Sequence, residues 1–311
     1  MATLKELEKK EELLSGGHRL CAGCGIPPIV RMILRSTESS VVATSATGCL
    51  EVGTTIYPYT AWRIPWIHSA FENAAATISG IETAYRAKQK RGKIPADKDI
   101  KFVAFGGDGG TYDIGLQALS GALERRHNFL YVCYDNGAYM NTGIQRSSAT
   151  PFGSNTTTSP AGEVIQGKQE WRKDLTRIVV AHNVPFAAQG SPNNWSDLSK
   201  KAEKALKVKG PTFLNVMSPC PLGWYTKSED SIKLAKLSVD TCYWPLYEVE
   251  EGVLRVTYKP KEKKPLAEWL KPQGRFKHLF KPENQPVPEA FQARVDKEWQ
   301  RLLDLDGKLV F

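Results

Sequence analysis

The sequence contains no hydrophobic run that approaches the roughly 20 residues needed to cross a bilayer, so we expect no membrane-spanning segment. Residues 1–14 are charged throughout and lack the apolar stretch of a secretory signal, so we expect a cytoplasmic protein. In that reducing compartment the six cysteines are not expected to form disulfides. The chain also lacks an internal repeat and any recognisable nucleic-acid-binding motif, so we expect neither a repeat protein nor a nucleic-acid partner.

What the sequence does contain is the composition of a globular α/β protein. Its 311 residues are 41% apolar, which suffices for a substantial core, and its 25 glycines and 19 prolines fit a loop-rich fold. The net charge is +9, and residues 259–281 alone carry +6, because eight lysines and arginines there face only two glutamates. This stretch is also rich in proline and holds Trp269, Phe276 and Phe280, which have little reason to stand in free solvent. We therefore interpret it as an arm that lies on a partner subunit.

Short β-rich runs alternate with helical patterns through the middle of the chain, which predicts βαβ units and a parallel sheet. The expected strands are residues 41–44, 102–105, 129–134, 185–188 and 212–216, and the expected helices are residues 69–90, 113–126, 174–182 and 196–207. Ser69 and Glu72 have the spacing of a capping box, which marks the start of the first of these helices. The sequence therefore predicts an α/β fold with an open parallel sheet and helices on both faces.

After about Pro245 this alternation ends. A short hairpin is expected over residues 246–258, followed by the basic arm and a last helix over residues 288–305. We therefore divide the chain into a binding domain, residues 1–245, and a C-terminal extension, residues 246–311, that serves subunit contacts.

A glycine-rich turn follows the second expected strand. Residues 101–110 end in Gly-Gly-Asp-Gly-Gly and lead directly into a helix, which offers backbone amides and a helix N-terminus to an anion. Many α/β proteins have such a turn, but here Asp108 is matched by Asn136 after the next strand, at the edge where open α/β sheets bind ligands. Together with the main-chain carbonyl of Ala138, these two side chains can hold Mg²⁺ against two phosphate oxygens.

Four of the six cysteines lie in expected loops. They are Cys21, Cys24, Cys49 and Cys220. Four thiolates on loops can ligate a [4Fe–4S] cluster. Structural zinc uses the same four ligands but usually draws them from two close Cys-x-x-Cys pairs, whereas this chain has one such pair and two single cysteines. Cys133 lies within a β-rich run and Cys242 stands beside two aromatic residues, so we expect both to be small buried residues.

These motifs make the chain resemble the β subunit of a multi-subunit 2-oxoacid:ferredoxin oxidoreductase, of the pyruvate synthase type or the related oxalate oxidoreductase type. The turn Gly107-Asp108-Gly109 with Asn136 is similar to the diphosphate-binding motif of thiamine-diphosphate enzymes. Further matching segments are residues 18–24, 47–51, 65–68, 71–73, 115–121, 141–146, 218–220 and 274–278. The resemblance covers nearly the whole chain.

The resemblance also implies roles for individual residues. The implied contacts to thiamine diphosphate are Gly107, Asp108, Gly109, Asn136, Ala138, Asn141 and Cys49. Among these, Asp108, Asn136 and the carbonyl of Ala138 are the implied Mg²⁺ ligands, and Asn141 lies near the thiazolium and the substrate, as the catalytic residue. The implied ligands of the [4Fe–4S] cluster are Cys21, Cys24, Cys49 and Cys220.

The implied activity belongs to a hetero-oligomer of anaerobic metabolism. Its substrate would be a small 2-oxoacid, with pyruvate and coenzyme A giving acetyl-CoA and CO₂, and electrons would pass through iron–sulfur clusters to ferredoxin. One partner subunit would carry the pyrimidine-binding domain with its activating glutamate, because this chain has room for only one α/β core. Another partner would carry ferredoxin-type clusters.

One departure from the family pattern leaves the substrate open. Pyruvate-type subunits usually have a glutamate where this chain has Gly137, so a relative that converts oxalate to two CO₂ without coenzyme A is an alternative. Two other readings are a non-oxidative thiamine-diphosphate lyase with structural zinc and an electron-transfer subunit without thiamine. His68 and Glu72 have structural reasons to exist near a helix start, and we assign them no catalytic role.

Overall fold

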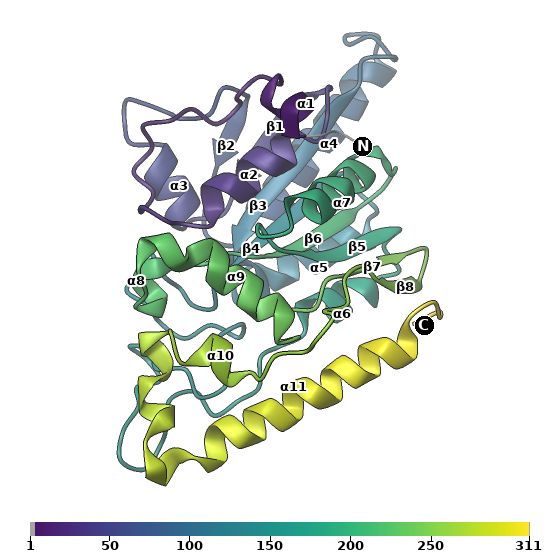
Figure 1. The fold of residues 1–311 in the computed structure, drawn as a ribbon. Coiled ribbons are helices and arrows are strands. Elements are labelled where there is room, and N and C mark those ends of the chain that lie inside the picture. The colour runs from purple at the N-terminus through teal and green to yellow at the C-terminus, as the bar shows by residue number, and fades with distance from the viewer. Residues whose placement is uncertain (1–3, 311) are drawn as a thin grey trace.

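The computed structural model describes residues 4–310, whose strands form a single eight-stranded sheet in the order β2-β1-β3-β4-β6-β5-β7-β8 (Figure 1). The strands are β1 (Ser40–Ser45), β2 (Trp66–His68), β3 (Ile100–Gly107), β4 (Leu130–Asp135), β5 (Phe186–Gly190), β6 (Thr212–Met217), β7 (Tyr247–Glu250) and β8 (Val253–Val256). Strands β1 to β6 are parallel, and the hairpin of β7 and β8 joins β5 in antiparallel pairing. The predicted open sheet is confirmed, with an antiparallel hairpin at one edge.

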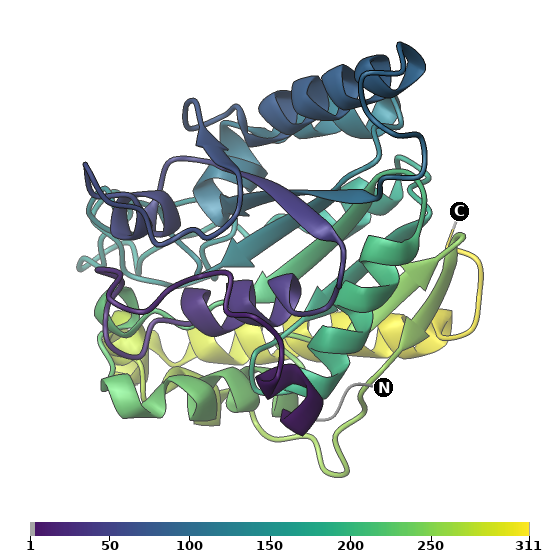
Figure 2. The same ribbon diagram turned by 90° about the horizontal axis from the view of Figure 1, so that it is seen from above.

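Helices cover both faces of the sheet, as predicted. The α-helices are α1 (Leu4–Glu8), α2 (Ile26–Leu34), α3 (Cys49–Thr54), α4 (Ala74–Lys90), α5 (Leu116–Glu124), α6 (Leu175–Val180), α7 (Trp195–Lys207), α8 (Pro221–Trp224), α9 (Ser231–Asp240), α10 (Ala267–Leu270) and α11 (Pro286–Leu305). Helices α2 and α7 pack on one face and α4, α5 and α6 on the other (Figure 2). None of the helices within residues 4–310 is long and apolar enough to cross a membrane.

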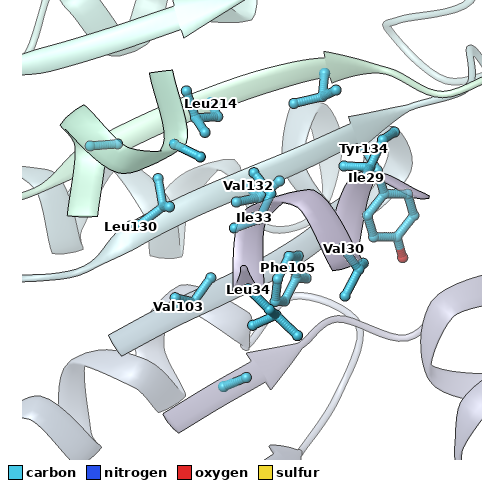
Figure 3. Close-up of a cluster of buried hydrophobic side chains, with 14 of the residues drawn as sticks. Ile29, Val30, Ile33, Leu34, Val103, Phe105, Leu130, Val132, Tyr134 and Leu214 are labelled. Carbon is cyan, nitrogen blue, oxygen red and sulfur yellow. The ribbon is translucent and has the colours of Figure 1, made fainter. Parts of the chain in front are cut away.

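The strand sequences explain why both faces are covered. Side chains alternate along a strand, so Val103 and Phe105 of β3 enter the cluster beneath α2, whereas Phe102 and Ala104 enter the cluster beneath α4 and α5. Figure 3 shows the side chains of α2 lying over Val103 and Phe105. Because both faces of the central strands are apolar, burial on both sides favours a parallel sheet enclosed by helices.

The order of the strands brings four loops to one edge of the sheet. Strands β1, β3, β4 and β6 are neighbours and parallel, so their carboxyl ends meet at the same edge. The loops that follow them contain Cys49, Asp108, Asn136 and Cys220. Residues that are far apart in the sequence are therefore brought to one place by the topology alone.

A third apolar cluster occupies the C-terminal part of the chain. The predicted hairpin and last helix are both present, as β7–β8 and α11. Trp269 and Phe276 are fully buried in this cluster together with Trp224, which precedes the hairpin in the chain. The chain's own packing therefore accounts for these aromatic residues, and they no longer argue that the arm lies on a partner. The division at residue 245 and the subunit contacts of the extension stay predictions.

The structure corrects two predicted helix boundaries. Helix α4 begins at Ala74 and not at residue 69, its N-cap Asn73 makes no side-chain cap, and the Ser69 hydroxyl bonds to Thr77, so the capping box is wrong. The helix predicted over residues 113–126 is shorter, since α5 covers Leu116–Glu124 and a short π-helical turn, Gly109–Asp113, precedes it. Strand β2 was not predicted, because its three residues are too few to show an alternating pattern.

Replacement of Trp269 tests whether the C-terminal cluster is part of this chain's own core. Trp269 is fully buried and its ring centroid lies 4.1 Å from that of Tyr243. We expect Trp269→Ala to lower the free energy of unfolding by about 3–5 kcal/mol, because a large cavity replaces the indole. Val164→Ala, at a side chain that is 93% exposed, serves as the control and should change it by less than about 0.5 kcal/mol. Equal effects in a urea titration would contradict the packing described here.

Candidate functional site

Asp108 is the buried acid at the carboxyl edge of the sheet, with an exposed fraction of 1%. Its Oδ1 accepts a hydrogen bond of 3.3 Å from the main-chain N–H of Asn136, and its Oδ2 accepts one of 2.5 Å from the hydroxyl of Ser147. These bonds join the loop after β3 to the loop after β4. Ser147 was not identified from the sequence, because a serine 39 residues away carries no motif that points to Asp108.

The three groups predicted to bind Mg²⁺ converge on one point. One terminal atom of the Asn136 amide lies 2.9 Å from both Asp108 Oδ1 and the main-chain oxygen of Ala138. If this atom is the amide nitrogen, it donates a hydrogen bond to each of these oxygens. If it is the amide oxygen, a carboxylate, an amide and a carbonyl oxygen face one another, and these are the ligands that a hard cation prefers. The residues therefore fit a magnesium ion.

A small pocket contains all seven residues predicted to contact the thiamine cofactor. They are Cys49, Gly107, Asp108, Gly109, Asn136, Ala138 and Asn141. The Tyr139 hydroxyl donates a 3.1 Å hydrogen bond to the Gly109 carbonyl, and a Cβ atom at Gly109 would lie 2.2 Å from the Tyr139 ring, so only glycine fits there. Tyr134 also lines the pocket, and its buried hydroxyl has no hydrogen-bond partner among the described residues. An unpaired buried hydroxyl suits a pocket that receives a polar ligand.

Buried charge surrounds this pocket. Burial and the nearby Asp135 carboxylate raise the pKa of Asp108 well above its usual range. Asp135 itself forms a 2.7 Å ion pair with Arg172, whose guanidinium lies 4.4 Å from the ring of Trp244. The pair neutralises one of the two acids, and Asp108 is the acid left without a cation. A bound metal ion would supply that missing charge.

Backbone hydrogen bonds connect the loops that carry the four predicted cluster ligands. Gly25 N–H, next to Cys24, donates a 2.9 Å bond to the carbonyl of Pro219, next to Cys220. Arg19 N–H donates a 2.7 Å bond to the carbonyl of Gly53 in α3, the helix that begins at Cys49. The structure thus brings the Cys-x-x-Cys loop, α3 and α8 together.

The four thiols interact electrostatically in every pair. The other three thiols raise the pKa of Cys24. Cys21 and Cys220 raise the pKa of Cys49, and Cys21 raises the pKa of Cys220. Burial first, and this mutual repulsion second, raise the pKa of Cys24 and of Cys49 to about 12. Four ionised thiolates would repel one another strongly at this site, and a cationic iron or zinc centre would relieve that repulsion.

The two remaining cysteines lie elsewhere, as predicted. Cys133 is buried inside strand β4 and Cys242 is buried between α9 and the hairpin. Neither takes part in the mutual repulsion of the four loop thiols. In the part of the chain that the structure describes, no three or more His, Cys, Asp or Glu side chains stand close enough to hold a single metal ion.

The cysteine loops are also connected to the pocket. The indole N–H of Trp224, in α8, donates a 2.7 Å hydrogen bond to the main-chain oxygen of Asn136. Ser218 N–H donates a 2.8 Å bond to the main-chain oxygen of Asp135. Cys49 both lines the pocket and belongs to the group of four thiols. The oxygen site and the sulfur site are therefore neighbours that share their supporting loops.

His68 lies beside this region. One of its ring nitrogens is 3.0 Å from the main-chain oxygen of Ser45, and the other is 3.4 Å from the hydroxyl of Thr47. Both contacts hold strand β2 against the end of β1, and His68 does not line the pocket. His68 therefore has a structural role, but the helix start expected at this residue is wrong, because His68 ends strand β2 and α4 begins at Ala74.

Comparisons with known proteins identify the family of this chain. Residues 46–216 match the family described as thiamine pyrophosphate enzyme, C-terminal TPP binding domain. The chain is 54% identical to pyruvate synthase subunit PorB of Thermotoga maritima, over 97% of this chain and 94% of that protein. It is 42% identical to ketoisovalerate oxidoreductase subunit VorB of Pyrococcus abyssi, over 95% of this chain and 94% of that protein.

A solved structure shares the fold. The 2-oxoglutarate:ferredoxin oxidoreductase of Magnetococcus marinus superposes with a TM-score of 0.55 at 20% identity, over 73% of this chain and 81% of that chain. At this level of identity the similarity shows a common fold alone.

Replacement of Asp108 tests the oxygen site. We expect Asp108→Asn, measured in the complex with its partner subunits, to weaken Mg²⁺-dependent thiamine diphosphate binding by at least about a hundredfold, because the amide cannot balance the cation's charge. Its iron content should not change. Asp113→Asn is the matched control, since Asp113 accepts from Ser148 and does not line the pocket. If equilibrium titration shows undiminished binding in Asp108→Asn, the assignment of the metal ligands is wrong.

Proposed function

Because the chain belongs to the β subunits of the 2-oxoacid:ferredoxin oxidoreductases, we propose that it holds the diphosphate of thiamine diphosphate through Mg²⁺ beside a [4Fe–4S] cluster. The observation that carries this proposal is the convergence of Asp108, Asn136 and the Ala138 oxygen in a pocket flanked by four mutually repelling thiols. When bound, thiamine diphosphate supplies the nucleophilic thiazolium carbon that makes decarboxylation of a 2-oxoacid accessible, and the cluster accepts electrons one at a time.

The residues of this chain divide the work at the cofactor. Asp108, Asn136 and the Ala138 carbonyl would hold the metal ion, and the backbone amides near Gly107 and Gly109 would face the diphosphate. Tyr139 fixes the glycine turn through its bond to the Gly109 carbonyl. Asn141 is exposed at the pocket, where we propose that it contacts the thiazolium and the substrate.

The distribution of the four cysteines along the chain supports a cluster over zinc. A zinc ion holds four sulfur ligands at about 2.3 Å each, which requires the sulfurs to stand close together. A four-iron cluster places four iron atoms between its thiolates and therefore accepts a wider arrangement. Structural zinc usually takes its ligands from two close Cys-x-x-Cys pairs, whereas this chain has the one pair Cys21 and Cys24, and Cys49 and Cys220 come singly from distant loops.

Pyruvate is the substrate we propose, with coenzyme A as acceptor of the acyl group. The support is the 54% identity to a protein named pyruvate synthase subunit PorB. The subunit named for ketoisovalerate is less similar, at 42% identity. Oxalate is the second candidate substrate, because this chain has Gly137 where pyruvate-type subunits usually have a glutamate. A carboxylate beside the pocket is therefore absent at this position. Turnover with pyruvate and coenzyme A, with ketoisovalerate and coenzyme A, and with oxalate alone would separate the three.

We propose a partner subunit for the remaining half of the cofactor site. All strands of residues 4–310 belong to one sheet, and this sheet provides one diphosphate half-site. The other half, with a glutamate that activates the aminopyrimidine, would come from a partner, and a further partner would pass electrons to ferredoxin.

Serine replacement of single cysteines tests the cluster. We expect the Cys220→Ser variant either to lose most of its iron or to hold a labile cluster, because oxygen is a poorer ligand than thiolate for this iron. Cys133→Ser, at a buried cysteine outside the group of four, should keep the iron content of the wild type. Iron and acid-labile sulfide per chain are measured after anaerobic purification. Equal loss in both variants would mean that the ligands are wrongly chosen.

Separation of the subunits tests the division of the cofactor site. We expect the isolated chain, even with an intact cluster, to show less than about a hundredth of the complex's pyruvate-dependent ferredoxin reduction, because no glutamate activates the aminopyrimidine. Adding the partner subunits should restore the rate. A rate from the isolated chain that matches the complex would overturn this division and place the missing glutamate within this sequence.

A further inference from the structure

Lys168 is a buried lysine whose ammonium binds main-chain carbonyls. Its exposed fraction is 1%. Its Nζ donates a 2.7 Å hydrogen bond to the carbonyl of Thr150 and a 3.3 Å bond to the carbonyl of Ser148. Burial first, and repulsion by Arg146 and Arg172 second, lower the pKa of Lys168 to about 8, so the side chain is still charged at neutral pH. A buried ammonium costs free energy, and its position calls for a reason in the two carbonyls that it holds.

The acids that attract Lys168 do not form an ion pair with it. Glu170 pairs with Arg146 at 3.3 Å, and Asp113 pairs with Lys173 at 3.6 Å. Among residues 4–310, no carboxylate oxygen lies within ion-pair distance of the Lys168 ammonium. Hydrogen bonds to the main chain are therefore what hold this side chain in place.

The main chain of Lys168 is fixed as well. Its N–H donates a 3.1 Å hydrogen bond to the carbonyl of Ser154, and its own carbonyl accepts a 2.8 Å bond from the N–H of Gly153. The preceding residue, Gly167, has a φ of +74°, and a Cβ atom there would lie 2.6 Å from the Ser154 carbonyl oxygen, so only glycine allows this close approach. The ammonium therefore reaches the carbonyls from a backbone that is itself anchored.

The two carbonyls belong to loop 147–150, which bridges the loops that carry the proposed metal ligands. The Ser147 hydroxyl donates a 2.5 Å hydrogen bond to Asp108 Oδ2, after β3. The Thr150 hydroxyl donates a 2.8 Å bond to the carbonyl of Gly137, which stands after β4 between the two other proposed ligands. The N–H of Ser147 in turn donates a 2.9 Å bond to the Thr150 hydroxyl. One short loop thus contacts both parts of the oxygen site.

We propose that Lys168 is a positioning residue for the metal ion and the diphosphate, and that it acts by fixing loop 147–150. The inference rests on the proposed function, since it requires Mg²⁺ and thiamine diphosphate to bind at Asp108. With two of its carbonyls held by the ammonium, the loop presents the hydroxyls of Ser147 and Thr150 to the ligand-bearing loops in one geometry. Mg²⁺ demands a near-ideal octahedron, whereas Ca²⁺ tolerates a looser arrangement. A loosened loop should therefore weaken binding with Mg²⁺ more than binding with Ca²⁺.

The experiment compares four variants of the complex with its partner subunits at pH 7. Lys168→Met removes the ammonium, Ser147→Ala removes the bond to Asp108, and a double variant combines the two changes. Lys201→Met is the matched control, because Lys201 is equally buried and also donates to a main-chain carbonyl, that of Gln189, but none of its hydrogen bonds reaches loop 147–150. Thiamine diphosphate affinity is measured by equilibrium titration with saturating Mg²⁺ and again with saturating Ca²⁺. The iron content and the thermal midpoint are recorded on the same samples.

We expect Lys168→Met and Ser147→Ala each to weaken thiamine diphosphate binding with Mg²⁺ by about tenfold, because both disturb the outer partners of a metal ligand. With Ca²⁺ the loss should be less than about threefold. The double variant should fall well short of the roughly hundredfold loss that independent effects would give, because both changes act on the same bond. Lys201→Met should stay within about twofold of the wild type even where its thermal midpoint falls, since its site is separate.

Three outcomes would overturn the proposal. Wild-type affinity in Lys168→Met removes it, an equal loss in Lys201→Met attributes the effect to stability alone, and independent losses in the double variant exclude the route through Ser147. If Lys168→Met does not assemble, Lys168→Gln takes its place: a loss of affinity confined to Mg²⁺ supports the proposal, and wild-type affinity overturns it. A wild-type complex that binds no thiamine diphosphate with Mg²⁺ contradicts the proposed function. A wild-type complex that binds it no better than its Lys168→Met and Ser147→Ala variants contradicts this inference alone.

Discussion

The repulsion between buried groups of like charge at one edge of the sheet is the constraint on which the site depends. The Asp135 carboxylate raises the cost of ionising Asp108, and the neighbouring thiols raise the cost of ionising Cys24, Cys49 and Cys220. The chain compensates only part of this charge, through the ion pair of Asp135 with Arg172. Without a bound cation the raised pKa values favour the protonated, neutral forms of these groups, and we propose that bound metal ions supply the charge that would allow them to ionise.

The topology explains why the two proposed metal-binding sites are neighbours. Four adjacent parallel strands end at one edge, so the loops with Cys49, Asp108, Asn136 and Cys220 meet without any long insertion. The bond from Trp224 to the Asn136 carbonyl joins the sulfur site to the oxygen site. In the proposed enzyme, electrons leaving the substrate would then have an acceptor next to the cofactor, held by the same loops.

The central sheet could be predicted from the sequence because it depends on local patterns, and the seven residues predicted to contact the cofactor lie in one pocket, although their roles stay predictions. Alternation on β3 and β4, the glycine turn at Asp108 and the cysteine spacing are all visible in short windows. What it could not predict depends on distant contacts. Ser147 bonds to Asp108 across 39 residues of sequence, and Trp269 and Phe276 of the basic arm pack inside this chain, which no local pattern reveals. The edge strand β2 and the start of α4 were missed because tertiary packing sets them.

The central claim is that thiamine diphosphate and an iron–sulfur cluster work together at this edge. The most direct test is the visible absorption of the anaerobic complex after pyruvate and coenzyme A are added, with and without Mg²⁺ and thiamine diphosphate. We predict that the iron–sulfur absorption bleaches only when the thiamine cofactor and its metal are both present, and that it returns when ferredoxin is added. Bleaching without the cofactor, or its failure with every 2-oxoacid tested while a chemical reductant still reduces the clusters, would contradict the account.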